Sequence, residues 1–140
     1  MKVENRTTVF YVDDNPKSSR LLTNVLEASG FRVITARDAA DALSLCKRTS
    51  FDLALLDYEM PGMSGAELAQ EIKFIVPDTP IVLISGYAVL PTTELLFVDA
   101  HFGLGTSLDD LLWTMRTLAG AELAAVVGGH RRVLQRADST

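Results

Sequence analysis

The sequence contains little that would support a disulfide framework, a membrane span or secretion. Cys46 is the only cysteine among 140 residues, so neither an intrachain disulfide nor a site of several thiolates can form. No stretch of about 20 apolar residues occurs, and the amino-terminal segment lacks the apolar run of a signal peptide. These absences predict a cytoplasmic protein that does not enter a membrane.

Positive charge is scarce and unevenly placed. Thirteen Lys and Arg residues stand against 18 Asp and Glu residues, which gives a net charge of −5. We do not expect an acidic chain of this kind to bind nucleic acid directly. The last lysine is Lys73 and the last proline is Pro91, so neither residue type occurs beyond position 91.

The hydrophobic pattern alternates between short apolar runs and longer amphipathic stretches. The runs, rich in β-branched and aromatic residues, predict parallel strands that are buried on both faces. The amphipathic stretches, several of them preceded by Ser or Asp, predict helices. The expected strands are Thr7–Val12, Arg32–Ala36, Leu53–Leu56, Ile81–Ile84 and Ala100–Leu104, and the expected helices are Pro16–Ser29, Asp38–Arg48, Ser64–Val76, a short one from Pro91 to Val98, and Ser107–Leu118.

This alternation predicts an α/β protein with right-handed crossovers. We expect a doubly wound, five-stranded parallel sheet in the order 2-1-3-4-5, which is a flavodoxin-like three-layer sandwich. Residues 1–119 would form this domain, and residues 120–140 would form a helical and basic tail with no effector domain.

Acidic residues follow two of the predicted strands. Asp13 and Asp14 come after the first strand, and Asp57 comes after the third. In an open parallel sheet, ligands bind beyond the carboxyl ends of the strands where the strand order reverses, so these carboxylates should share one cleft. Three such groups are costly to keep ionised without a cation, and Mg²⁺ suits their oxygen ligands. For any one of them, a helix cap or a solvated loop acid is the alternative.

Three segments, FYVDDN, LALLDYEMPGMSG and IVLISGY, resemble the receiver domain of two-component response regulators. The resemblance implies that Asp57 accepts a phosphoryl group from a histidine kinase or a phosphotransfer protein, and that the domain is regulatory rather than an enzyme. It also implies a Mg²⁺ site and a group of phosphoryl contacts. The implied Mg²⁺ ligands are Asp13 (through water), Asp14, Asp57 and the backbone carbonyl of Glu59, and the implied phosphoryl contacts are Ser85 and Gly86.

The chain departs from the family pattern near the end of the fifth strand. Receivers carry Lys followed by Pro there, and counting back from Ser107 places Leu104 and Gly105 at those two positions. His101 falls at the position of the family's aromatic switch residue. No shift of register restores the pair, because no Lys follows Lys73. A charge-assisted hydrogen bond worth about 1.5–3 kcal/mol would be lost with the lysine.

Two functions stay open at this point. The first is a receiver whose phosphorylation on Asp57 switches the binding of a downstream protein or the formation of a homodimer. The second is a degenerate receiver that works as an interaction or dimerisation module independently of phosphorylation, because Leu104 replaces the lysine. Two enzyme alternatives are weak. The glycines at 103 and 105 lack the rest of a dinucleotide-binding motif, and Asp57-Tyr58-Glu59 lacks the second Asp of haloacid-dehalogenase phosphatases.

Overall fold

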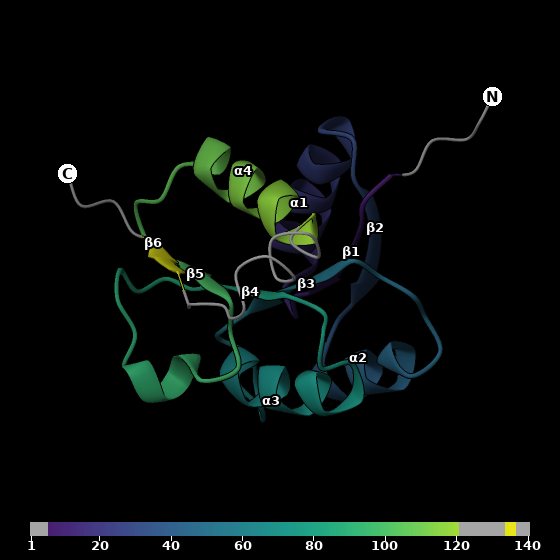
Figure 1. Ribbon diagram of the computed structural model, residues 1–140, viewed down its shortest axis with the longest axis vertical. Helices are drawn as coiled ribbons and strands as arrows, with labels where there is room; N and C mark the ends of the chain where they lie inside the picture. Colours follow the sequence, from purple (N-terminus) through teal and green to yellow (C-terminus); the bar gives the residue numbers. More distant parts are fainter. Residues whose placement is uncertain (1–5, 121–133, 137–140) are drawn as a thin grey trace.

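A parallel β-sheet separates two layers of helices in the computed structural model, which describes residues 6–120 and 134–136 (Figure 1). The strands are β1 (Thr8–Val12), β2 (Arg32–Ala36), β3 (Leu53–Asp57), β4 (Ile81–Ile84), β5 (Ala100–Phe102) and β6 (Leu134–Arg136). Helices α1 (Pro16–Ala28) and α4 (Leu108–Ala119) lie on one face of the sheet, and α2 (Ala39–Cys46) and α3 (Gly65–Ile75) lie on the other. The order β2-β1-β3-β4-β5-β6 confirms the predicted 2-1-3-4-5 sheet and adds one strand at its edge.

The position of each strand in the sheet explains its composition. In β1, β3 and β4, which lie inside the sheet, most residues are buried because helices cover both faces. Strand β2 lies at one edge, and of its five residues only Ala36 is buried. The five predicted strands are confirmed, with ends that differ by at most two residues.

Side-chain caps begin the helices at the residues that the sequence predicts. Asp38 and Ser107 each accept a hydrogen bond from a backbone N–H three residues further on, at the starts of α2 and α4. Ser64 and Glu67 form a reciprocal capping box at the start of α3. Each cap is worth about 1 kcal/mol. Together they fix the loops at the edge of the sheet where the strands have their carboxyl ends.

Two segments differ from the prediction. Between Pro91 and Val98 the chain forms only one 3₁₀ turn, η1 (Thr92–Leu95), rather than a helix. This turn has no side-chain cap and buries only Leu95, so it lacks the apolar stripe that would hold a longer helix on the sheet. Strand β6 was not predicted, and it pairs in parallel with β5. The rest of the predicted tail, 121–133 and 137–140, lies outside the described residues.

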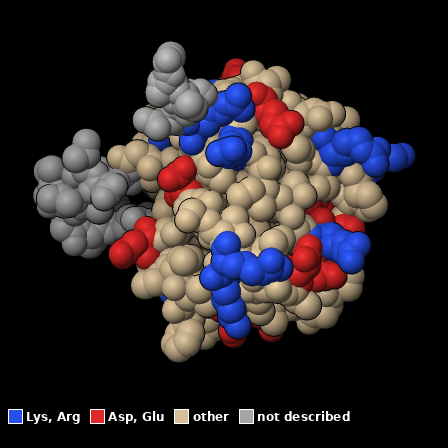
Figure 2. Space-filling model, turned by 90° about the vertical axis from the view of Figure 1, so that its right-hand side faces the viewer, with Lys and Arg blue, Asp and Glu red and all other residues tan. Residues whose placement is uncertain are grey.

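Charged side chains are dispersed over the face of the molecule that Figure 2 shows. Lys and Arg side chains lie among Asp and Glu side chains there, and the described residues of that face form no continuous basic surface. Among the helices of residues 6–120, none is long and apolar enough to cross a bilayer.

Candidate functional site

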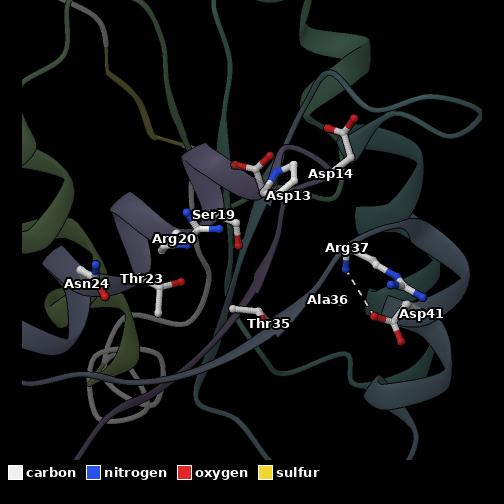
Figure 3. A pocket seen from close by; sticks show the side chains of 11 residues that line it. Asp13, Asp14, Ser19, Arg20, Thr23, Asn24, Thr35, Ala36, Arg37 and Asp41 are labelled. Carbon is white, nitrogen blue, oxygen red and sulfur yellow. Dashed lines mark hydrogen bonds between the residues drawn. The ribbon is translucent and has the colours of Figure 1, made fainter.

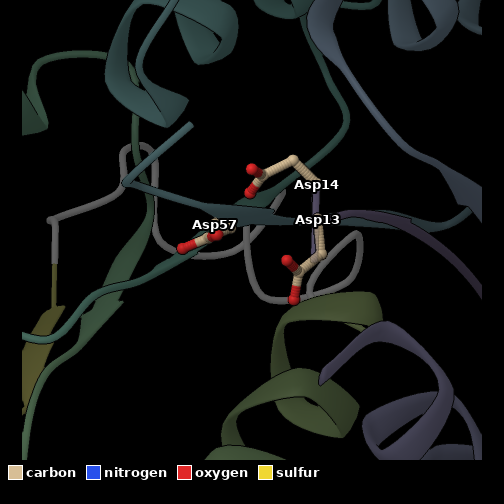
Figure 4. A group of neighbouring side chains, drawn as sticks. All are labelled: Asp13, Asp14 and Asp57. Atoms are coloured by element: carbon tan, nitrogen blue, oxygen red, sulfur yellow. The ribbon is translucent and has the colours of Figure 1, made fainter. Parts of the chain in front are cut away.

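Three carboxylates lie together at the carboxyl ends of two paired strands. Asp13 and Asp14 directly follow β1, and Asp57 is the last residue of the neighbouring β3. One oxygen from each carboxylate lies within 4.8 Å of the others (Figure 4). The strand order therefore brings together the three acidic residues that the sequence singled out. We call these three residues the acidic cluster.

Backbone groups hold two members of the acidic cluster in place. The N–H of Asn15, the residue that caps α1, donates to Oδ1 of Asp13 at 3.0 Å. The N–H of Glu59 donates to Oδ1 of Asp57 at 3.3 Å. Asp14 is exposed and makes no hydrogen bond with another described residue. Its carboxylate is thus the most available of the three to a ligand from solvent.

Gly65 lets α3 begin directly behind Asp57. A Cβ at this position would collide with the backbone carbonyl of Asp57 and would lie 2.7 Å from Cδ1 of Leu83. The Gly65 N–H also donates to the carbonyl of Tyr58 at 2.9 Å. The close approach of this helix to β3 fixes the position of the Asp57 backbone at the carboxyl end of the strand.

Burial and the neighbouring carboxylates raise the pKa of Asp57 to about 7. Desolvation is the largest cause, the charge of Asp13 is the next, and Asp14 adds a smaller effect. The hydrogen bond from the Glu59 N–H lowers the pKa in part. The fold therefore holds three carboxylates close together although their negative charges repel one another. Such a donor set fits a hard divalent cation such as Mg²⁺.

The acidic cluster lines an open cavity of about 410 Å³. Glu59 and Ser85 line the same cavity. No Lys, Arg or His lines it in the part of the chain that the structure describes. The roles predicted for the Glu59 carbonyl and the Ser85 hydroxyl remain predictions, since proximity alone does not assign them.

Ser85 lies in a small hydrogen-bond cluster that involves β5. Its Oγ is 2.7 Å from Nε2 of the fully buried His101 and 3.0 Å from the carbonyl oxygen of Tyr87, whose N–H donates back at 3.1 Å. A hydroxyl has a single proton, so Ser85 donates either to the Tyr87 carbonyl, with Nε2 of His101 as a donor to Oγ, or to Nε2 itself. To donate to a phosphoryl oxygen, Ser85 would have to give up the acceptor that its proton now serves. Gly86, the other predicted phosphoryl contact, follows Ser85 and is exposed.

The turn at residues 103–105, which we call the glycine turn, is built without a basic side chain. Leu104, at the position of the family's lysine, is 68% exposed. Gly105 has a φ of +92°, which a proline ring, held near −65°, cannot adopt. A Cβ on Gly103 would collide with the carbonyl of Tyr87. Here the chain closes tightly against the loop that follows β4.

A larger cavity of about 680 Å³ lies beside Asp13 and Asp14 and extends from α1 to the loop after β2 (Figure 3). Arg20 and Arg37 line it together with these two carboxylates. Over residues 6–120, neither guanidinium lies within 4.0 Å of a carboxylate oxygen, and the Arg37 backbone N–H donates to Asp41 at 3.3 Å. The two arginines thus place positive charge around the same cavity as Asp13 and Asp14 without forming an ion pair with either carboxylate.

Tyr11 belongs to the site although the sequence pattern did not single it out. Its hydroxyl donates to Oδ2 of Asp13 at 2.6 Å, inside the 410 Å³ cavity. Burial and the bond to Asp13 raise the pKa of Tyr11 above its usual value. Two signals were available: alternation along β1 puts Tyr11 and Asp13 on the same face, and a buried tyrosine hydroxyl needs a partner.

Comparisons with curated proteins point to one family. The family model of the response regulator receiver domain matches residues 9–101. The chain is 35% identical over 114 residues to the sensor histidine kinase RcsC of Salmonella typhi, which covers 79% of this chain and 12% of that protein. It is 31% identical over 127 residues to the DNA-binding response regulator MtrA of Mycolicibacterium smegmatis, which covers 91% of this chain and 51% of that protein. The chain therefore spans only part of the length of these relatives.

Solved structures agree with that family match. The response regulator TrrA of Thermotoga maritima, in complex with Mg²⁺ and beryllofluoride, superimposes with a TM-score of 0.75 at 30% identity over 80% of this chain and 98% of that chain. A structure of the histidine kinase ThkA in complex with TrrA matches with a TM-score of 0.73 at 30% identity, over 80% of this chain and 97% of that chain.

Proposed function

Because the chain belongs to the response regulator receiver domain family, we propose that it accepts a phosphoryl group on Asp57 from a histidine kinase or a phosphotransfer protein. The observation that carries this proposal is the acidic cluster, whose ligand oxygens lie within 4.8 Å of one another. As a receiver domain, the chain is a regulatory part of a two-component system. TrrA, a relative of the same fold, is found in complex with a histidine kinase.

Asp57 is the nucleophile in this reaction. One of its carboxylate oxygens forms a bond to phosphorus while the bond between phosphorus and the donor's histidine nitrogen breaks, and the electron pair of that bond leaves with the nitrogen. The residue suits this role because it lies at the wall of an open cavity and the Glu59 N–H orients its carboxylate. Phosphoryl transfer depends mainly on such positioning and on charge neutralisation.

Asp13, Asp14, Asp57 and the backbone carbonyl of Glu59 would hold Mg²⁺ in this proposal. When bound, the ion supplies positive charge that offsets the carboxylates and the transferred phosphoryl group. The all-oxygen donor set supports this assignment, as does the Mg²⁺–beryllofluoride complex of TrrA. With a pKa of about 7, Asp57 is only partly ionised at neutral pH, so we expect phosphorylation to require a divalent cation.

Ser85, Gly86 and His101 would carry the signal away from Asp57. Ser85 and Gly86 would contact the phosphoryl oxygens, and Ser85 would then exchange its present acceptor for a phosphoryl oxygen. His101 is 2.7 Å from the Ser85 hydroxyl, fully buried in β5 and in register with Leu83 of β4, so this exchange acts directly on the core on the α3 face of the sheet. The output would be altered binding of a downstream protein or altered homodimerisation.

The glycine turn favours a second candidate, a phosphorylation-independent interaction module. Leu104 exposes an apolar side chain at the lysine position, and no Lys follows Lys73 in the sequence. A receiver of this kind would accept the phosphoryl group weakly or without a change in partner binding. Partners would bind the same surface of the phosphorylated and the unphosphorylated protein.

Intact mass spectrometry after incubation with Mg²⁺ and a small-molecule phosphodonor tests the first candidate. We expect one added phosphoryl group on the wild type, and none on Asp57→Asn or in the presence of EDTA. No addition to the wild type, or an equal addition to Asp57→Asn, would contradict the proposal.

Self-association measured by analytical ultracentrifugation separates the two candidates. A change of more than about tenfold in the dimer dissociation constant on adding Mg²⁺ and beryllofluoride, which is about 1.4 kcal/mol, supports the switch. A smaller change rejects a switch that acts through homodimerisation.

A further inference from the structure

Tyr11, in β1, belongs to the apolar core by its ring and to the acidic cluster by its hydroxyl. The ring packs with Leu26 of α1 and Met115 of α4 in the core on one face of the sheet, and the side chain is 1% exposed. The hydroxyl lines the same cavity as Asp57 and donates to Oδ2 of Asp13 at 2.6 Å. Because close packing on all sides holds the ring, the core fixes where this donor lies.

The Tyr11 hydroxyl is the one side-chain hydroxyl, amine or guanidinium group that bonds to the acidic cluster within residues 6–120. The other donors from outside the acidic cluster are backbone N–H groups, from Asn15 to Oδ1 of Asp13 and from Glu59 to Oδ1 of Asp57. Asp13 therefore has one donor on each oxygen, which fixes the plane of its carboxylate. Each oxygen keeps a further acceptor position for a cation or its water.

A neutral donor has a consequence that a basic residue would not have. A lysine or arginine on Asp13 would cancel one negative charge of the acidic cluster and compete with a cation for it. The phenol of Tyr11 orients Asp13 and leaves that charge in place. Removal of a hydrogen-bonding partner behind a metal ligand lowers metal affinity by about 10–100-fold in known sites.

We propose that Tyr11 is a positioning residue: its hydroxyl holds the Asp13 carboxylate toward Asp14 and Asp57 and thereby sets the affinity of the acidic cluster for Mg²⁺. The consequence for the rate of phosphoryl acceptance rests on the proposed function of Asp57. The consequence for Mg²⁺ affinity does not.

Isothermal titration calorimetry with Mg²⁺ alone tests this proposal on Tyr11→Phe. The substitution removes one oxygen and keeps the buried ring, so the fold should be retained. We expect the dissociation constant for Mg²⁺ to rise by about tenfold or more. The matched control is Tyr58→Phe, which also deletes a hydroxyl bonded to a carboxylate, that of Glu94 at 3.1 Å. A change below about twofold in Tyr11→Phe, or an equal change in the control, would overturn the proposal.

A spectroscopic measurement tests the same contact without changing Tyr11. The chain has three tyrosines, and in the Tyr58→Phe, Tyr87→Phe double variant only Tyr11 remains. We expect Mg²⁺ to produce a tyrosine difference spectrum in this variant, because the ion changes the charge on the acceptor of the Tyr11 hydroxyl. The signal should saturate with the calorimetric dissociation constant. Absence of the signal at saturating Mg²⁺ would also overturn the proposal.

The phosphorylation assay distinguishes the failure of this inference from the failure of the proposed function. Weaker Mg²⁺ binding in Tyr11→Phe together with an unreactive wild type would sustain the role of Tyr11 and reject phosphoryl acceptance. A reactive wild type with unchanged Mg²⁺ affinity in Tyr11→Phe would reject the role of Tyr11 and sustain Asp57. If both hold, raising Mg²⁺ should restore most of the phosphorylation rate of Tyr11→Phe.

Discussion

The acidic cluster and the glycine turn lie at the same edge of the sheet but are built by different means. At the ends of β1 and β3, hydrogen bonds from Tyr11 and from backbone N–H groups hold charged side chains close together. After β5 the chain closes through glycines, and its exposed side chain, Leu104, carries no charge. Under the proposed function, binding a cation and accepting a phosphoryl group would depend on one set of residues, and transmitting the signal would depend on another. The two properties should then respond to separate substitutions.

The largest effect should come from removing charge in the acidic cluster. Asp14→Asn should weaken Mg²⁺ binding by at least about 100-fold, at or beyond what the loss of a second-shell partner costs. The free energy of unfolding without Mg²⁺ should change little, because Asp14 is exposed and bonded to no other described residue. Calorimetry with Mg²⁺ and chemical denaturation measure the two quantities.

Asp109→Asn is the matched control for Asp14→Asn. Asp109 is an exposed acid in the first turn of α4, so its substitution removes one negative charge near the glycine turn instead of in the acidic cluster. Its Mg²⁺ affinity should equal that of the wild type. Equal losses in the two variants would mean that general attraction, and not the acidic cluster, binds the ion.

The two buried glycines test how rigidly each region is held. Gly65→Ala and Gly103→Ala should each lower the free energy of unfolding by about 2–3 kcal/mol, because the new Cβ would meet a backbone carbonyl that cannot move alone. Only Gly65→Ala should also weaken Mg²⁺ binding, since the obstructing carbonyl is that of Asp57. Gly86→Ala is the control, because the nearest atom would be 3.8 Å away. Loss of Mg²⁺ affinity in Gly103→Ala would contradict the separation of the two regions.

The pH dependence of stability should reveal the repulsion within the acidic cluster. The folded pKa of Asp57, about 7, lies above the ordinary value of 3.8, so the folded state binds more protons than the unfolded state between these values. Without Mg²⁺, this group should therefore lower the free energy of unfolding as pH rises from about 4 to about 7. The expected loss is about 1–2 kcal/mol, less than the full shift implies, because Asp57 is partly exposed and water screens it.

Asp57→Asn isolates this contribution from the other titrating groups. In chemical denaturation with EDTA, the variant should be more stable than the wild type above pH 7, and the difference should vanish near pH 4. Saturating Mg²⁺ at pH 7.5 should stabilise the wild type more than the variant. A wild type that becomes more stable relative to the variant as pH rises without Mg²⁺ would contradict the raised pKa.

Much of the fold and of the acidic cluster follows from local sequence signals. The strands are apolar runs because helices cover both faces of the sheet, and the caps at Asp38, Ser64 and Ser107 mark where helices begin. Once the strand order is given, parallel strands bring Asp13 and Asp57 to one edge without any further information. Position after a strand thus sufficed to place the charges.

The contacts that depend on side chains meeting across the fold could not be predicted in the same way. The bond between Ser85, just after β4, and His101 of β5 joins residues 16 positions apart, and it depends on rotamers that the sequence does not display. Strand β6 is three residues long, too short to show a strand pattern in the sequence, and its pairing with β5 is a tertiary effect. Tyr11 resembled an ordinary core residue because its ring is one.

The smallest effect should come from adding a charge to the glycine turn. Leu104→Lys should leave the free energy of unfolding within about 0.5 kcal/mol, because the side chain is 68% exposed. Its affinity for beryllofluoride in the presence of Mg²⁺ should rise by about 3–10-fold. A charge-assisted hydrogen bond gives about 1.5–3 kcal/mol in general, and ordering a long lysine side chain offsets part of it. Leu108→Lys, an exposed position at the start of α4, is the control for general attraction.

The same variant decides what limits transmission through β5. If the missing charge is the limit, beryllofluoride should change the self-association of Leu104→Lys by more than it changes that of the wild type. If the turn itself is the limit, beryllofluoride should bind more tightly to Leu104→Lys but change its self-association no more than it changes that of the wild type. The reason is that Gly105 at a φ of +92° and the close contact of Gly103 with Tyr87 keep the backbone in its present path. Equal gains in beryllofluoride affinity for Leu104→Lys and Leu108→Lys would show that general attraction, and not a contact specific to position 104, causes the gain. We expect the second outcome, since one added side chain leaves the glycine-built backbone unchanged.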